Sequence, residues 1–291
     1  MAARIAVPCV RCLVRASDRG TESMTRRTPI FPDRDIQFLV ETVLPERSDK
    51  ERLVEVVRDD PEFVDAMLSD ERLFERVMTD EGILVQITPR LFFHVLLIRT
   101  RKDMQGERYT LERRARQKIP VFDTHHVVDL LEDRRVMDYL AQMLASFTRT
   151  ESFTYPVRVR KGIWYKHRFS DLDVDSLIRL CQSLEEDQRF SLYKRIADVC
   201  LFLSGMFPEH VQPVGFFPPD GPRLRGRRDL EDYEQDGRQF YELAAQHQGA
   251  TILGLRQVLD TLSESFTLAE KPLTFLSEHY LLTRKHSLFA I

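Results

Sequence analysis

The sequence lacks the short motifs by which the commonest enzyme classes are recognised. It has no GxGxxG after a predicted strand, no phosphate loop ending in Gly-Lys-Ser or Gly-Lys-Thr, no HExxH and no GxSxG. Missing motifs do not exclude an enzyme, but they place nucleotide-binding enzymes and hydrolases behind other classes. The sequence therefore favours a protein without catalytic activity.

Long hydrophobic runs are also missing. The longest apolar stretch extends from Ile196 to Phe207 and contains Asp198. Such a stretch is too short to cross a bilayer. We therefore expect no membrane-spanning segment and no membrane partner.

Cysteine and glycine are scarce, with 4 cysteines and 11 glycines in 291 residues. Little glycine, together with frequent Leu, Arg, Glu and Asp, favours helices. Cys181 and Cys200 lie within apolar helical patterns, which is typical of buried free thiols in a reducing compartment. We therefore expect a cytoplasmic protein.

The chain has no strong excess of one charge. It contains 43 Lys and Arg against 46 Asp and Glu, which gives a net charge of −3. The chain as a whole is therefore not strongly attracted to nucleic acid or to anionic membranes, and any such contact needs a local patch. Hydrophobic residues make up 43%, which is enough for a folded core in one large domain or two small ones.

The first residues differ in composition from those that follow. Residues 1–23 contain four arginines and no acid before Asp18, as an organelle transit peptide would. Cys9-x-x-Cys12 could instead form half of a zinc or redox site, although a tetrahedral zinc needs four ligands. We favour a disordered tail over residues 1–27, because nothing in it can bury a core.

Capping residues locate several helix starts. Ser48 with Glu51 forms a capping-box pattern, and Asp60-Pro61 and Thr88-Pro89 are typical N-cap and first-turn pairs. Further helices are predicted over 60–69, 70–79, 136–147, 170–184, 189–207, 229–247 and 251–270, with Pro272 starting a final short one. The stretch 189–207 is apolar almost all round, so we expect it to be the central core helix.

One β-hairpin is predicted near residues 156–168. Residues 157–160 alternate Val and Arg, Lys161-Gly162 can form the turn, and Ile163-Trp164-Tyr165 follows. The stretch 208–228 contains five prolines and three glycines, which predicts a long loop. The expected fold is therefore all-α, a multi-helix, bundle-like assembly. The hairpin separates an N-terminal part, 28–150, from a C-terminal part, 151–291, and the two either pack separately or share one core.

Asp198 is the most informative polar residue of the predicted core. A carboxylate in the middle of a buried helix must be paired or protonated. We predict a contact with Arg238, on the helix whose stripe Tyr233, Gly237 and Tyr241 form. We favour a structural pair over a catalytic acid, because buried acids occur in structural ion-pair networks as well as in active sites.

Three histidines were considered as metal ligands. His94 lies in an apolar helix and is better explained as a neutral, buried side chain than as a haem or metal ligand. His125 and Asp129 stand four residues apart on a predicted helix, with Asp123 and His126 nearby. Two ligands do not make a metal site, so we favour a helix start and expect no metal and no cofactor.

Basic residues gather in the hairpin and in the long loop, and a third cluster occupies residues 113–118. The residues that suit nucleic acid through phosphate contact and base stacking are Arg158, Arg160, Lys161, Trp164, Tyr165, Arg225, Arg227 and Arg228. The alternative is a solvated strand edge whose arginines prevent aggregation. The clusters matter for binding only if they share one face.

Three functions follow from the sequence. The first is a cytoplasmic interaction or regulatory protein with an unknown protein partner. The second is a nucleic-acid-associated protein that uses the hairpin and the arginine-rich loop. The third is an enzyme or cofactor-binding protein with its site at the central helix.

Overall fold

The computed structural model of the chain describes residues 31–114, 117–149, 152–160, 163–170, 172–211 and 228–289. The expected tail over 1–27, with Cys9 and Cys12, lies outside the described residues, as do Lys161, Arg225 and Arg227. Within the described residues the fold is all-α, as predicted. No helix there is long and apolar enough to span a membrane.

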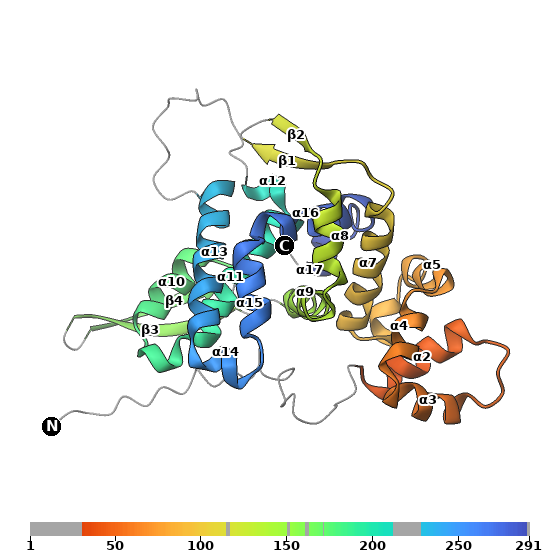
Figure 1. Cartoon of the computed structure of the whole chain (residues 1–291). Coiled ribbons are helices and arrows are strands. Elements are labelled where there is room, and N and C mark those ends of the chain that lie inside the picture. Colours follow the sequence, from red (N-terminus) through yellow and green to blue (C-terminus); the bar gives the residue numbers. More distant parts are fainter. Residues whose placement is uncertain are drawn as a thin grey trace.

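The helices are α2 Asp33–Val43, α3 Lys50–Asp59, α4 Pro61–Leu68, α5 Glu71–Thr79, α6 Ile83–Gln86, α7 Pro89–Met104, α8 Thr124–Glu132, α9 Arg134–Phe147, α10 Val174–Gln182, α11 Phe190–Met206, α12 Pro208–Val211, α13 Leu230–Gln246, α14 Gln248–Ile252, α15 Arg256–Glu264, α16 Phe266–His279 and α17 Lys285–Phe289. The strands are β1 Thr110–Arg114, β2 Gln117–Val121, β3 Ser152–Arg160 and β4 Ile163–Ser170. Figure 1 shows their arrangement.

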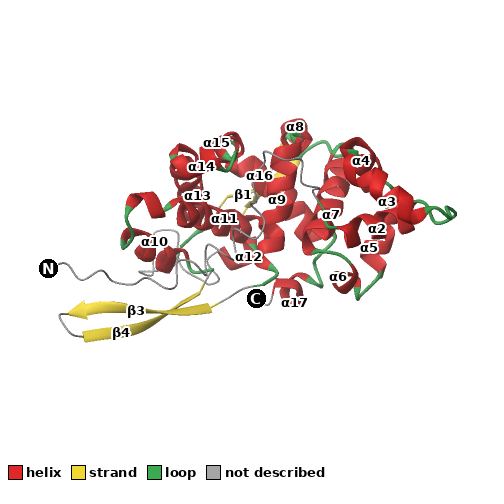
Figure 2. Cartoon of the chain, turned by 90° about the horizontal axis from the view of Figure 1, so that it is seen from below, coloured by secondary structure: helices red, strands yellow, loops and turns green. Residues whose placement is uncertain are grey.

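The strands form two separate antiparallel hairpins. The predicted hairpin is β3–β4, which is confirmed and extends as a ribbon beyond the helices (Figure 2). The hairpin β1–β2 was not predicted, because its strands are short and rich in charge and carry Pro120. Proline is tolerated there because β2 is an edge strand. β1 packs against α16.

The predicted starts of α4 and α7 are confirmed. Asp60 accepts hydrogen bonds from the backbone N–H groups of Glu62 and Phe63, and the Thr88 hydroxyl accepts one from Leu91 N at 3.2 Å. The capping box at Ser48 is wrong, because α3 begins at Lys50 after Asp49 and without a side-chain cap. The two short helices over 60–69 and 70–79 are confirmed as α4 and α5.

The C-terminal helices differ from the prediction. The single helix expected over 251–270 is broken twice. One break is at Gly254, whose φ of 67° lies in the left-handed region that glycine adopts without steric cost. The other is at Ser265, where α15 ends and α16 begins. Pro272 does not begin a helix but lies inside α16. Pro208, placed in a loop by the sequence, begins the short helix α12.

The central position predicted for residues 189–207 is confirmed by α11. Every residue from Ile196 to Met206 is buried, and α11 packs against α10, α13 and α16 (Figure 1). Its contact with α13 is close at Gly237, where a Cβ atom would lie 2.2 Å from the Phe266 ring and 3.2 Å from Cys200 Cβ. One connected cluster of buried hydrophobic residues includes members from Phe31 to Phe289.

Candidate ligand pocket

Asp198 lies in the dry centre of the protein, with 1% of its surface exposed. The hydroxyls of Tyr139 and Tyr241 donate to its Oδ1 at 2.6 and 2.8 Å, and Lys194 Nζ donates to its Oδ2 at 2.7 Å. These bonds come from α9, α13 and the preceding turn of α11. Both carboxylate oxygens are therefore satisfied, which is what a buried charge needs to be tolerated.

The predicted contact between Asp198 and Arg238 is wrong. Its guanidinium donates to Thr267 Oγ1 at 3.3 Å instead, and the Asp198 carboxylate is held by Tyr139, Tyr241 and Lys194. The physical reason is helical periodicity. Tyr241 stands four residues after Gly237, so both face α11, whereas Arg238 is rotated by about 100° towards α15 and α16.

Tyr233 also belongs to the stripe predicted on α13. It is partly buried against the core, and this burial raises its pKa. Cys200 lies close to it on α11. Of the two predicted tyrosines, Tyr241 is therefore the one that completes the hydrogen-bonded centre around Asp198.

His94 is buried on α7, as predicted, with 4% of its surface exposed. Burial lowers its pKa to about 3, with nearby arginines acting in the same direction, so its ring is neutral at physiological pH. Its Nδ1 lies 3.4 Å from Asp138 Oδ1, too long for a hydrogen bond to be formed between them. Burial also raises the pKa of Asp138.

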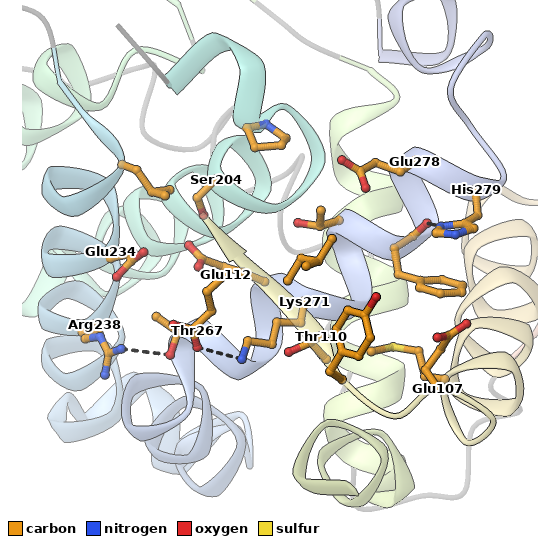
Figure 3. Close-up of a pocket in the computed structure, with 18 residues that line it drawn as sticks. Glu107, Thr110, Glu112, Ser204, Glu234, Arg238, Thr267, Lys271, Glu278 and His279 are labelled. Carbon is orange, nitrogen blue, oxygen red and sulfur yellow. Dashed lines mark hydrogen bonds and ion pairs between the residues drawn. The ribbon is translucent and has the colours of Figure 1, made fainter. Parts of the chain in front are cut away.

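A cavity of about 390 Å³ lies between β1, α11, α13 and α16. Figure 3 shows Glu234 and Arg238 of α13 on one side of it, Lys271 of α16 in the middle and Glu278 at the far end. The charged residues that line it are Glu107, Glu112, Glu234, Arg238, Glu270, Lys271 and Glu278. Glutamates outnumber the two cations among these lining residues.

Glu270 has the most unusual environment in this pocket. Its Oε1 is buried and has no hydrogen-bond partner among the residues that the structure describes. Burial, with Glu234 adding to the effect, raises the pKa of its carboxyl to about 8, while the Ser204 hydroxyl and Arg238 act in the opposite direction. The side chain is therefore mostly protonated at neutral pH when the pocket holds no positive group.

Lys271 is the better satisfied neighbour of Glu270. Its Nζ donates to Glu112 Oε1 at 2.8 Å and to Asp123, although only 6% of the Lys271 side chain is exposed. Asp123 in turn accepts from the Thr110 hydroxyl at 2.5 Å. This network ties β1 to α16 and to the start of α8, and it neutralises Glu112.

The residues considered as metal ligands lie around the start of α8. Asp123 precedes α8 and is held by Lys271 and Thr110, and the rings of His125 and His126 lie 3.9 Å apart. Among the residues that the structure describes, no three His, Cys, Asp or Glu residues are placed to hold a metal ion.

The predicted nucleic-acid residues are only partly placed. Arg228 is bound by Asp175 at 2.7 Å and by Asp236, so two carboxylates already neutralise it. In β3–β4 the register pairs Arg158 with Trp164 and Val157 with Tyr165. The strand register shifts between Arg158 and Arg160, which marks a β-bulge or a similar irregularity.

The chain matches no protein-family model, and no curated protein and no solved structure is significantly similar to it. The function must therefore be inferred from the site itself.

Proposed function

We propose that this protein binds a small organic cation in the pocket between β1, α11, α13 and α16. The observation that carries the proposal is Glu270, which lines a cavity of about 390 Å³ with a buried carboxylate oxygen that no described residue meets with a hydrogen bond. A buried acceptor without a partner costs free energy, and a ligand donor that reaches it recovers that cost.

The charge of the lining favours an ammonium group. Lys271 is already held by Glu112 and Asp123, and Glu278 lies 3.8 Å from Lys118 Nζ. Glu234 lies close enough to Glu270 to raise the pKa of its carboxyl, and Arg238 is the charged group that opposes this effect from the same helix. A cation placed beside Glu234 and Glu270 would be attracted by both carboxylates in a partly dry site.

The proposal joins two functions expected from the sequence. One is a protein with a ligand site at the central helix, and Ser204 of this helix, α11, lines the pocket. The other is a cytoplasmic regulatory protein with a protein partner, since binding of a small cation can control such a protein. Buried free thiols at Cys181 and Cys200 support the cytoplasmic location.

A second candidate function is acid–base catalysis at the same pocket. Its support is the pKa of about 8 at Glu270 beside a second carboxylate, Glu234, since carboxyl pairs with separated pKa values divide acid and base roles. Turnover of a bound amine, followed by mass spectrometry, would distinguish an enzyme from a binding protein.

Nucleic-acid binding by β3–β4 remains a further proposal. β3 carries Arg158 and Arg160, and β4 carries Trp164, Lys166 and Arg168, with Arg158 paired to Trp164 in the strand register. Cations beside a Trp suit phosphate contact with base stacking. Retention on heparin that falls steeply with salt would support it, because phosphate contacts release counterions.

The cation proposal is tested by isothermal titration calorimetry with 1,4-diaminobutane. Succinate and 1,4-butanediol serve as an anionic and a neutral control of similar length. We expect binding of the diamine alone, and loss of roughly tenfold or more in affinity in Glu270→Gln, since the variant keeps the shape and removes the charge. Glu55→Gln, at an exposed glutamate of the distant helix α3, is the matched control and should bind as the wild type does.

The affinity should also depend on pH. A cation favours the ionised form of Glu270, so binding releases a proton below the pKa of about 8. The affinity is therefore expected to rise about tenfold per pH unit from about pH 6 towards pH 8 in the wild type and to stay flat in Glu270→Gln. Equal binding of succinate and the diamine would reject the proposal.

A further inference from the structure

A second cavity adjoins the first. It has a volume of about 310 Å³ and shares two lining residues with the first cavity, Met104 and Glu107. Its other walls come from the end of β2 and from α8 and include Phe122, His125 and Asp129. Met104 and Glu107 therefore stand in the walls of both cavities, which lie next to each other along β1–β2, α7, α8 and α16. We refer to the two adjoining cavities together as the cleft.

Carboxylates occur along the whole cleft. Glu234 and Glu270 line the first cavity, Glu107 lies where the two meet, and Asp129 lines the second cavity. Arg108 and His125 also line the second cavity, so any attraction for a cation there depends on Glu107 and Asp129 and is weaker than at Glu270. The cleft thus offers negative groups at intervals instead of one compact binding point.

Exposed aromatic rings lie at the junction between the cavities. Tyr109 lines the first and Phe122 the second, and their ring centroids are 6.2 Å apart in an edge-to-face arrangement. Phe122 is 74% exposed and Tyr109 46%, and Leu111 of β1, which also lines the first cavity, is 44% exposed. Large apolar side chains at this exposure can cover the alkyl part of a ligand between two charged groups.

We propose that the cleft binds a linear polyamine, with one ammonium group beside Glu234 and Glu270 and another between Glu107 and Asp129. The methylene segment between them would lie against Tyr109 and Phe122. This inference rests on the proposed function, because it uses the cation site of the first cavity, and it adds the length and the repeated charge of the ligand. Runs of lysine side chains share this chemistry with free polyamines, and the test separates the two.

The test compares 1,4-diaminobutane, spermidine and spermine by calorimetry with the full chain. We expect affinity to rise with length, by roughly tenfold from diamine to spermine, because the added ammonium groups meet carboxylates of the second cavity. Asp129→Asn and Phe122→Ala should lower spermine affinity towards that of the diamine and leave the diamine unchanged. Both residues are exposed and line the second cavity, so their replacement should not disturb folding.

Glu132→Gln is the matched control, since Glu132 is an exposed acid of the same helix α8 that does not line either cavity. Equal affinity for diamine and spermine, or equal loss of both in Asp129→Asn, would overturn the elongated site and leave the cation pocket standing. Tighter binding of tetralysine than of spermine would assign the cleft to a peptide and overturn the free polyamine. Failure of every amine to bind would reject the pocket itself.

Discussion

Asp198 and Glu270 are both carboxylic acids that the fold withdraws from water, and their surroundings differ in kind. Asp198 is met by two tyrosine hydroxyls and an ammonium group. Glu270 lines a cavity and has a buried oxygen without a hydrogen-bond partner in the described part of the chain. A satisfied polar centre stabilises a helix assembly, whereas an unsatisfied acceptor beside empty volume is suited to a ligand.

The comparison also separates two effects of burial on acidity. At Glu270, burial and Glu234 raise the pKa of the carboxyl to about 8. At the centre around Asp198, burial and the nearby carboxylate raise the pKa values of Tyr139 and Tyr241, so both phenols stay protonated and remain donors. Burial thus fixes the hydrogen bonds around Asp198, whereas it leaves the Glu270 carboxyl with a proton that it can exchange near neutral pH.

The largest effect is expected from Asp198→Ala. The substitution leaves the Tyr139 and Tyr241 hydroxyls and the Lys194 ammonium group without their acceptor in a dry site. We expect a loss of about 3–5 kcal/mol in the free energy of unfolding, measured by urea denaturation. Asp260→Ala, which removes an exposed carboxylate 3.8 Å from Arg256, should cost less than about 1 kcal/mol. Similar losses in the two variants would contradict a structural role for Asp198.

The burial of Asp198 could be predicted from the sequence, but its partners could not. An acid within the apolar run from Ile196 to Phe207 must be buried if the helix is central, and this expectation is confirmed. Tyr139 lies on α9 and reaches Asp198 only through tertiary packing. Arg238 was chosen for its charge, whereas periodicity places the neutral Tyr241 on the face that meets α11.

Local capping signals predicted the starts of α4 and α7 correctly but failed at Ser48 and at Pro272. Asp60 and Thr88 satisfy backbone donors within three residues, so their effect is contained in the sequence. The break at Gly254 depends on a left-handed φ that glycine permits but does not require. Pro272 inside α16 shows tertiary packing overriding a local preference.

The pocket could not be predicted because its residues are brought together from distant elements. Glu112, Ser204, Glu234 and Glu270 come from β1, α11, α13 and α16. The sequence prediction ended a helix at residue 270 and gave no reason for Glu270 to be buried. Its burial follows only from the position of α16 beneath β1, and the hairpin β1–β2 was itself not predicted.

The second largest effect is expected from Glu270→Gln, which should change how the stability of the protein depends on pH. The folded state keeps a proton on Glu270 up to about pH 8, whereas the unfolded chain releases it above the ordinary pKa of 4.5. Stability contributed by the protonated form is therefore complete below pH 4.5 and is lost as the pH rises towards 8. The wild type should lose on the order of a few kcal/mol more than the variant over this interval. Parallel stability curves for the two proteins would contradict the burial of this carboxyl.

A smaller effect is expected from Tyr139→Phe. The variant removes one of the two hydroxyl donors to Asp198 Oδ1 and leaves the ring in place, over which Lys194 Nζ lies at 4.9 Å. Because Tyr241 and Lys194 still satisfy the carboxylate, the free energy of unfolding should fall by about 1–2 kcal/mol. Chemical denaturation at neutral pH measures this free energy. A loss as large as that of Asp198→Ala would mean that the hydrogen bond from Tyr139 alone stabilises the buried Asp198 carboxylate.

The matched hydroxyl deletion at the other carboxyl is Ser204→Ala, and it should have the smallest effect on stability. Ser204 donates to Cys200 O at 2.8 Å within its own helix, so its loss should change the free energy of unfolding by less than about 0.5 kcal/mol. The hydroxyl lowers the pKa of Glu270, and because it has a single hydrogen it can do so only by turning from Cys200 O to the carboxylate when Glu270 ionises. The variant should therefore bind 1,4-diaminobutane more weakly at neutral pH and recover at higher pH. An unchanged pH profile of affinity would show that Ser204 does not act on the Glu270 carboxyl, and the contrast between a satisfied and an exchangeable acid would then depend on Glu234 and Arg238.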